Sequence, residues 1–430
     1  MRYFEDSMSR PQAAGEADAQ SSAAEAAQLE STYAWLRLAA AVGLSTIGGA
    51  GMWSVVVALP ALQAEFGVAR AAASFPYTLT MVCFGLGGVL MGRLADRFGV
   101  VFPIVLGIIT LGAGYVIAAA ATTLWQFSLA QGVLLGLGSS ATFAPLLSDT
   151  SKWFTRRRGM AVGICASGNY LAGTLWPPVV QHFINVAGWR HTYVGIGLFC
   201  FVTMLALSVV LRRSAPKQGD TSADAPGPPW SSRPLGLSPL ALQVLLSIAG
   251  VACCVAMSMP QVHLVAYCAD LGYGAARGAE MLSVMLGFGI VSRLTSGWIC
   301  DHIGGLRTLL LGSTLQGIAL LLFVPFDGLL SLYVIAALFG LFQGGIVPSY
   351  AIIIRDYFPP QETGSRVGIV IMATLFGMAL GGWMSGAIFD LTGSYKAAFV
   401  NGLVWNAINV SIAVWLLRRA RTESRLARAM

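Results

Sequence analysis

The sequence predicts an all-α membrane protein with twelve transmembrane helices, arranged as two related six-helix halves. The first observation is composition: 56% of the residues are hydrophobic, 10% are charged and the mean hydropathy is +0.71. Such a chain has too little polar surface to coat a soluble globule of 430 residues. The second is that apolar runs long enough to cross ~30 Å of hydrocarbon recur along the whole chain. The third is a polar stretch that divides these runs into two sets.

The apolar runs define the spans expected from the sequence. In order along the chain they are residues 34–60, 74–92, 100–121, 124–148, 159–184, 191–212, 240–268, 279–299, 305–325, 329–354, 365–389 and 395–417.

The basic residues predict the orientation. The net charge is +7, but with a cytoplasmic N-terminus nearly every Lys and Arg falls on the inner side. The exceptions are four residues in outer loops and one within a span: Arg70, Arg190, Arg277, Lys396 and Arg293. The positive-inside rule therefore predicts that both termini are cytoplasmic. This placement accounts for the positive charge, so we expect no nucleic-acid partner.

The polar segments predict the domain organisation. Residues 1–33 lack an apolar core after a basic start, so we expect a disordered cytosolic tail and not a signal peptide. Residues 212–236 are rich in Pro, Gly, Ser and charge, which predicts a flexible cytosolic linker between six-helix halves at 34–211 and 237–417. Residues 418–430 are expected to form a basic cytosolic tail.

Glycines and one aspartate recur at a constant offset of 205 residues, which indicates internal duplication. The pairs are Gly67 and Gly272, Gly92 and Gly297, Asp96 and Asp301, Gly99 and Gly304, Gly159 and Gly364, and Gly188 and Gly393. Duplicated six-span units are typical of secondary transporters, whose substrate site lies near the bilayer midplane between the repeats.

The duplicated segments GRLADRFG (Gly92 to Gly99) and GWICDHIG (Gly297 to Gly304) are predicted to form tight cytoplasmic loops. A carboxylate there can accept hydrogen bonds from a helix N-terminus or an arginine and so latch the halves in one state. The gating candidates are Gly92, Asp96, Arg97, Gly297 and Asp301.

These loops resemble the signature of the major facilitator superfamily, whose fold has twelve helices in two halves. The basic pair usual after the second glycine is replaced here by Val100 and Val101.

Arg293 is the one basic residue well inside an apolar span, Met281 to Cys300. A charge there costs roughly 3 kcal/mol on insertion scales, so it requires a partner, water or an anionic ligand. One interpretation is that it snorkels to the headgroups. The other is that it faces a central site and binds a carboxylate through two parallel hydrogen bonds.

Two further segments, Pro145 to Tyr193 and Pro260 to Gly274, resemble the monocarboxylate transporter branch, including its bacterial members. So does the position of Arg293, four residues before Gly297. The resemblance implies that Arg293 is the carboxylate ligand. Two departures put proton coupling by the animal mechanism in doubt: Gly289 stands where animal members have an aspartate, and the first span lacks their lysine.

Other polar residues in the spans are weaker candidates for the substrate site. Asn169 either binds substrate or ties two helices together. His263 is the internal titratable group that can carry a proton, although a histidine toward the outer end of a span is more often a packing or interfacial residue. Gln343 and Tyr350 are second-rank candidates, and Pro348 is expected to bend the helix before Tyr350.

The function predicted is secondary active transport of small monocarboxylates by alternating access, with proton coupling open. The alternatives are another organic anion, such as an aromatic acid or sulfonate, efflux of a drug, or a non-transporting membrane sensor. No nucleophile and base pair, metal-ligand cluster or phosphate loop indicates an enzyme, and no cofactor or metal is expected. The expected partners are the organic anion, lipids and protons, and the expected state is a monomer in the inner (plasma) membrane.

Overall fold

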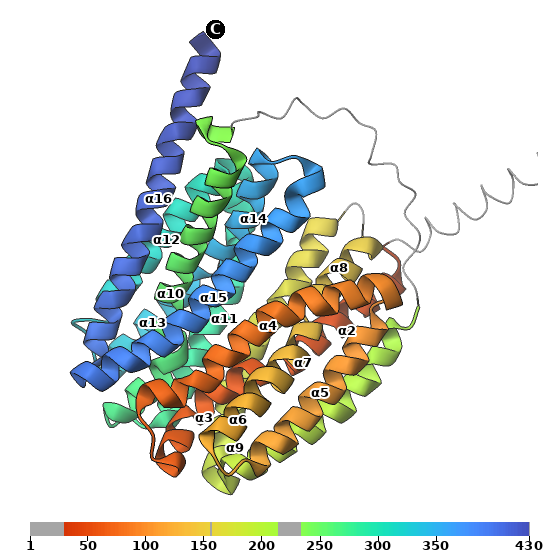
Figure 1. Cartoon of the computed structure of the whole chain (residues 1–430), viewed down its shortest axis with the longest axis vertical. Coiled ribbons are helices and arrows are strands. Elements are labelled where there is room, and N and C mark those ends of the chain that lie inside the picture. Colours follow the sequence, from red (N-terminus) through yellow and green to blue (C-terminus); the bar gives the residue numbers. More distant parts are fainter. Residues whose placement is uncertain (1–29, 155–156, 214–233, 430) are drawn as a thin grey trace, which may run out of the picture.

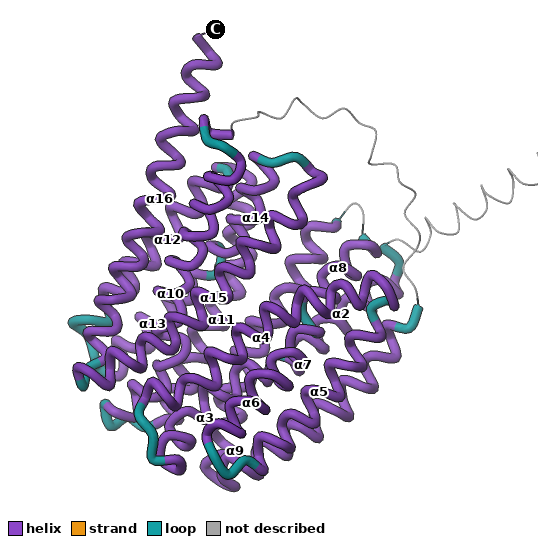
Figure 2. The backbone as a smooth tube through the Cα atoms, viewed as in Figure 1, coloured by secondary structure: helices purple, strands orange, loops and turns teal. Residues whose placement is uncertain are grey.

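The computed structural model describes residues 30–154, 157–213 and 234–429, which are helical apart from short connections (Figure 2). Within these residues, 11 helices are long and apolar enough to cross a membrane. One of them, Gly159–Leu211, has 53 residues, enough for two crossings, and it bends at Gly188, where φ is 77° and ψ is 161°. The chain is thus a multi-pass membrane protein, and the predicted all-α fold is confirmed.

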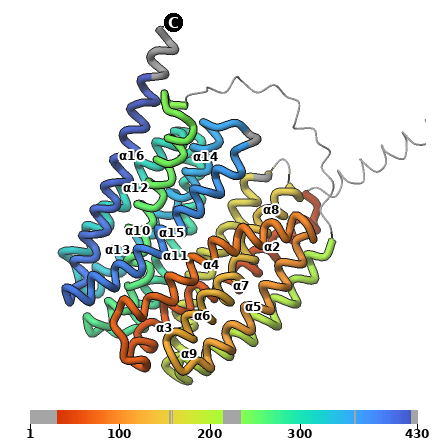
Figure 3. The backbone as a smooth tube through the Cα atoms, in the orientation of Figure 1, coloured from red at the N-terminus to blue at the C-terminus, as the bar shows by residue number. Residues whose placement is uncertain are grey.

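The helices fall into two groups that lie side by side, red to yellow-green and green to blue in Figures 1 and 3. The first group comprises α2 (Thr32–Gly48), α3 (Ala50–Phe66), α4 (Arg70–Phe98), α5 (Val101–Ala120), α6 (Leu124–Leu129), η1 (Ala130–Leu135), α7 (Gly136–Ala141), α8 (Ala144–Trp153), α9 (Arg158–Ser208) and η2 (Val209–Leu211). The second comprises η3 (Pro234–Gly236), α10 (Pro239–Asp270), α11 (Ala275–Ile303), α12 (Gly305–Leu322), α13 (Leu329–Gln343), α14 (Ile346–Tyr357), α15 (Pro360–Thr392) and α16 (Tyr395–Ala429). We call these groups the N half and the C half.

The internal repeat is visible in the backbone. The bounds of α4 and α11 differ by the same 205 residues as the sequence motif. At three of the matched pairs both glycines have positive φ: Gly67 and Gly272, Gly99 and Gly304, and Gly188 and Gly393. Only glycine adopts this conformation without a steric penalty, so these pairs fix where the helices end or turn in each half.

The expectation that the two gating motifs are loops is wrong. Helix α4 continues to Phe98 and α11 to Ile303, so most of each motif forms the last two turns of a helix. The first glycine of each motif, Gly92 or Gly297, lies within the helix. The helix ends at the second, Gly99 or Gly304, because φ is positive there.

Three expected spans are also interrupted. The first breaks at Gly49 into α2 and α3. The fourth breaks at Thr142 and Phe143, between α7 and α8. The tenth breaks at Gly344 and Gly345, between α13 and α14. Pro348 lacks the N–H that would bond to the carbonyl four residues earlier, at Gly344, so the helix breaks one turn before the proline.

The ends of the chain differ in detail from the predicted boundaries. Ser31 caps α2, with its side chain accepting from the Ala34 N–H, so helix begins inside the expected tail. Helix α16 continues to Ala429, through the expected basic tail. The rest of the N-terminal tail and most of the linker lie outside the described residues.

The molecule has two ends, which we name by their connections. The linker end is where α9 and η2 lead into the linker and α10 follows it, and the far end is where α3 turns into α4 and α10 turns into α11 (Figure 1). The larger hydrophobic core draws residues from both halves, and a smaller one lies within the C half.

Candidate functional site

Helices α9 and α11 form a seam between the halves. The Ser283 hydroxyl donates to the Thr174 carbonyl, and Arg293 lies further along α11 against Ala166 of α9. Residue numbers rise along one helix as they fall along the other, so the two helices run antiparallel. The seam therefore brings the central region of the C half against that of the N half, where the repeat pattern predicts a substrate site.

Arg293 points across this seam. Its guanidinium carbon lies 4.4 Å from the centroid of the Tyr170 ring on α9. Its Nη1 donates to the Ala166 carbonyl over 3.3 Å, and its buried Nε has no hydrogen-bond partner. No carboxylate among the described residues forms an ion pair with it. The side chain is half-buried, so this region presents a cation to which the described residues supply no anionic partner.

Asn169 and Gln343 lie close to this region. Asn169 is half-buried and lies three residues from Ala166, on the same face of α9. Gln343 is fully buried; its Oε1 accepts from Gln261 Nε2 over 3.1 Å, and its own Nε2 has no partner. The residue after it adjoins α11, because a Cβ added at Gly344 would lie 2.5 Å from the Gly289 carbonyl oxygen. Two buried donors without partners, Arg293 Nε and Gln343 Nε2, therefore lie on the adjoining helices α11 and α13.

Tyr350 and His263 are held elsewhere. The buried Tyr350 hydroxyl accepts from Asn409 Nδ2 over 3.1 Å within the core of the C half. His263 is also buried, with Nε2 2.7 Å from the Gly382 carbonyl and Nδ1 3.1 Å from the Tyr395 hydroxyl. Each is satisfied by its own half, so a contact with substrate would require rearrangement.

The gating candidates lie at the linker end. Asp96, Arg97 and Asp301 are exposed, and the Arg97 guanidinium lies 5.2 Å from the Phe98 ring. A Cβ added at Gly92 or Gly297 would meet no atom within 4 Å. Their roles as gates and those of the substrate-site candidates stay predictions.

A polar cluster at the far end was not predicted as a site. Arg70 of the N half pairs with Asp270 of the C half, with Nη2 3.0 Å from each carboxylate oxygen. Asp390 accepts from the backbone N–H groups of Arg70 and Ala71, each over 2.8 Å. The Arg70 guanidinium also lies 4.8 Å from the Phe389 ring. The sequence does carry a signal: each charged residue stands within three positions of a positive-φ glycine that ends a helix.

Comparison with known proteins identifies the family. The model of the Major Facilitator Superfamily matches residues 41–329 and 281–429. The chain belongs to this superfamily.

Within the superfamily, the chain is similar to monocarboxylate transporters. Monocarboxylate transporter 13 of Rattus norvegicus is 31% identical over 325 residues, covering 73% of this chain and 72% of the relative. Monocarboxylate transporter 11 of Mus musculus is 28% identical over 384 residues, covering 86% and 84%. Among solved structures, the nucleoside transporter NupG aligns with a TM-score of 0.68 and 14% identity over 89% of this chain and 99% of that one, which shows the shared fold. The protein is a monocarboxylate transporter-like member of the superfamily.

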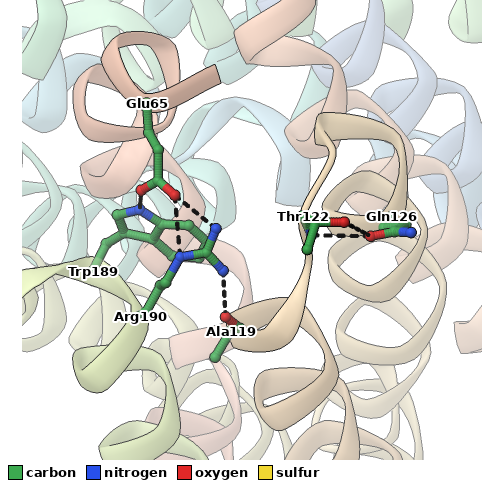
Figure 4. Close-up of polar contacts among 6 residues, drawn as sticks. All are labelled: Glu65, Ala119, Thr122, Gln126, Trp189 and Arg190. Atoms are coloured by element: carbon green, nitrogen blue, oxygen red, sulfur yellow. Dashed lines mark hydrogen bonds and ion pairs between the residues drawn. The ribbon is translucent and has the colours of Figure 1, made fainter.

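Two further ion pairs shape the N half of this major facilitator protein. At the far end, Glu65 accepts from Trp189 Nε1 and from two nitrogens of Arg190, which also donates to the Ala119 carbonyl (Figure 4). These hydrogen bonds connect the ends of α3 and α5 to the residues that follow the bend at Gly188 in α9. Nearby, Gln126 accepts from the Thr122 N–H and hydroxyl and closes the α5–α6 turn (Figure 4).

The second pair, Arg37 with Asp149, lies at the linker end and is buried. Arg37 Nε and Nη2 donate to the two carboxylate oxygens over 2.9 and 3.0 Å, the parallel geometry that is strongest for this pair. Arg37 Nη1 donates to the carbonyl of Arg213, at the start of the linker. The pair joins α2 to α8 and to the end of the N half.

Proposed function

We propose that this protein transports small monocarboxylates across the membrane by alternating access, with Arg293 as the carboxylate ligand. The observation that carries the proposal is the state of Arg293: its guanidinium lies on the α9–α11 seam, its buried Nε has no partner, and the described residues supply no carboxylate for it. A cation inside a membrane requires a compensating anion or water. A substrate carboxylate is an anion that fits the planar guanidinium.

The number of charges favours a monocarboxylate. Arg293 is the only Lys or Arg that the sequence places deep in a span, so one substrate charge is compensated and a second would be left without a partner. The similarity to transporters named for monocarboxylates supports the same substrate class. Asn169 and the unpartnered Gln343 amide are the donors we assign to the rest of the substrate.

Alternating access is supported by where the halves meet. The Arg70 cluster joins them at the far end, while added Cβ atoms at Gly159 and Gly364 of the linker end would meet nothing within 4 Å. We assign the linker end to the cytoplasm and the protein to the plasma membrane, because the basic residues gather at that end. The proposed cycle opens the Arg70 cluster and closes the linker end around the substrate.

The test is uptake by purified protein in proteoliposomes. Radiolabelled acetate, pyruvate, L-lactate and benzoate are offered with and without an inside-alkaline pH gradient, and succinate serves as the dicarboxylate. We expect uptake of at least one monocarboxylate and none of succinate. Stimulation by the pH gradient would establish proton coupling.

Variants of the anchor decide the mechanism. Arg293→Gln should lose uptake, and Arg293→Lys should lose most of it, by about tenfold or more, since it keeps charge but loses the two-pronged geometry. The matched control is Arg277→Gln on the same helix, whose side chain is exposed and pairs with Glu280. Normal monocarboxylate uptake by Arg293→Gln would show that the arginine only snorkels.

A further inference from the structure

We propose that Tyr170 is a positioning residue for Arg293: its ring holds the plane of the guanidinium in the orientation that binds a carboxylate, and position 289 is glycine so that this ring fits. The proposal rests on the proposed function, because it assigns how the same anchor is prepared for its ligand. It concerns one residue from each half and the glycine between them.

The contacts place the Tyr170 ring in a slot on α11. Its centroid lies 4.4 Å from the Arg293 guanidinium carbon. A Cβ added at Gly289 would lie 2.6 Å from Tyr170 Cδ1 and would also collide with Cε1. Gly289 and Arg293 are four residues apart on one helix, so they are neighbours on one face. The ring, 9% exposed, fills the space over Gly289 and lies against the arginine one turn away.

Stacking leaves the binding edge of Arg293 free. In the parallel geometry that we propose, the guanidinium lies with its face on the Tyr170 ring, whereas it binds a carboxylate through N–H bonds in its own plane. The Tyr170 ring therefore competes with no carboxylate hydrogen bond, and the buried Nε remains without a partner. If the guanidinium plane is already fixed before binding, the substrate does not have to order the Arg293 side chain. The entropy loss on binding is then smaller and the affinity for the carboxylate is higher.

The stacking also couples the site to the relative position of the halves. Tyr170 belongs to the N half and Arg293 to the C half, so the prepared guanidinium exists only while this seam is closed. Any ligand that binds better to the stacked arginine favours the closed seam to the same extent. Tyr170 thus links carboxylate binding to the motion that transport requires.

The first experiment measures KM and maximal rate for pyruvate and benzoate uptake in proteoliposomes. Tyr170→Leu should raise KM by about tenfold, within the twofold to thirtyfold range of a cation–π contact, with little change in maximal rate. Tyr170→Phe keeps the ring and should stay within about twofold of wild type. Gly289→Ala should resemble Tyr170→Leu, because the new methyl group displaces the ring.

The matched control and the double variant make the result specific. Gly287→Ala lies on the same helix, but its added Cβ would be 3.5 Å from Thr174 Cγ2, an ordinary contact, so KM should not change. Combining Gly289→Ala with Tyr170→Leu should cost no more than either change alone, since both remove the same stacking. An additive effect, or equal loss in Tyr170→Phe and Tyr170→Leu, would overturn the proposal.

A second measurement needs no substrate. Phenylglyoxal modifies arginine side chains, and peptide mass spectrometry gives the modification rate of Arg293 in detergent-solubilised protein. The rate should rise several-fold in Tyr170→Leu and stay unchanged in Tyr170→Phe and Gly287→Ala. Equal rates in wild type and Tyr170→Leu would refute the positioning role, whereas normal uptake by Arg293→Gln would refute the role of Arg293 as carboxylate ligand and leave this readout intact.

Discussion

Arg70 and Asp270 join the two halves at the far end, with the arginine Nη2 3.0 Å from both carboxylate oxygens. The Arg70 side chain is 8% exposed and that of Asp270 36%, so water weakens the pair and its strength alone is modest. Asp390 adds to it by accepting two backbone N–H groups from the first turn of α4. Together they favour the arrangement in which the far end is closed.

The first prediction concerns this closure. Asp390→Ala removes the acceptor for two orphan N–H groups of α4, a loss of about 1 kcal/mol for a helix cap, so the closed population should fall about fivefold relative to the open one. Spin labels at the exposed positions Ala120 and Leu330 report the distance between the halves by double electron–electron resonance. Cys83 is replaced by Ser in this background, because the other six cysteines are buried.

The control for Asp390 is Asp327→Asn. Asp327 pairs with Lys396 over 3.5 Å within the C half, and both are half exposed, so its loss should not move the halves. If Asp390→Ala gives the same distance distribution as this control, the far-end cluster does not set the conformation.

The second prediction concerns stability at the linker end. Arg37→Met leaves Asp149 buried without its partner, and breaking a buried pair in this way costs about 3–5 kcal/mol. The variant should lose monodispersity in detergent and melt at a lower temperature. The double variant with Asp149→Leu removes both charges and should recover much of the loss, because it leaves no unpaired ion. A double variant as unstable as Arg37→Met would contradict this explanation.

Most of the fold could be predicted because it depends on local sequence. Apolar length gave the spans, and the offset of the glycine pairs gave the two halves, since Gly99 and Gly304 stop their helices by positive φ. The sequence does not predict the ends of α4 and α11, because a motif bounded by glycines is typical of a loop. In the structure, Gly92 and Gly297 lie within the helices. The helix breaks at Gly49 and Gly344 could not be predicted from hydropathy, because hydropathy carries no information on backbone geometry.

The site was less predictable because its contacts are between distant segments. The sequence alone draws attention to Arg293, because a charged residue within an apolar span is rare. Nothing in the sequence alone shows that Tyr170 lies over it, because that contact depends on how α9 and α11 pack. Likewise the pairing of Arg70 with Asp270 joins residues 200 positions apart.

The third prediction concerns His263, the one histidine of four that is buried. Nε2 donates to the Gly382 carbonyl, so Nδ1 accepts from the Tyr395 hydroxyl, and a proton added at Nδ1 would displace that bond. If this exchange carries the transported proton, His263→Gln should keep uptake down a substrate gradient but lose stimulation by an inside-alkaline gradient. His191→Gln, at an exposed position, is the control. Unchanged stimulation in His263→Gln would remove the histidine from proton coupling.

The fourth prediction concerns Asp96, which is exposed at the end of α4. Asp96→Asn should slow turnover while substrate affinity stays within a few-fold, because the residue biases conformations and does not touch the ligand. Melting temperature should not change, since exposed substitutions usually alter stability by under about 0.5 kcal/mol. Arg93→Gln on the same helix is the control. Normal turnover in Asp96→Asn would exclude a gating role for this carboxylate.

The α4–α15 and α9–α11 contacts between the halves are one contact made twice. The 205-residue offset carries α4 onto α11 and the first part of α9 onto α15, and α4 lies along α15 just as α11 lies along α9, with Thr78 donating to the Ala379 carbonyl and Ser283 to the Thr174 carbonyl. A pair of identical six-helix units joined by this surface would be an isologous dimer with a two-fold axis. The single chain thus retains the geometry of a symmetric dimer, and the proposed substrate site departs from that symmetry because Arg293 is present in only one half.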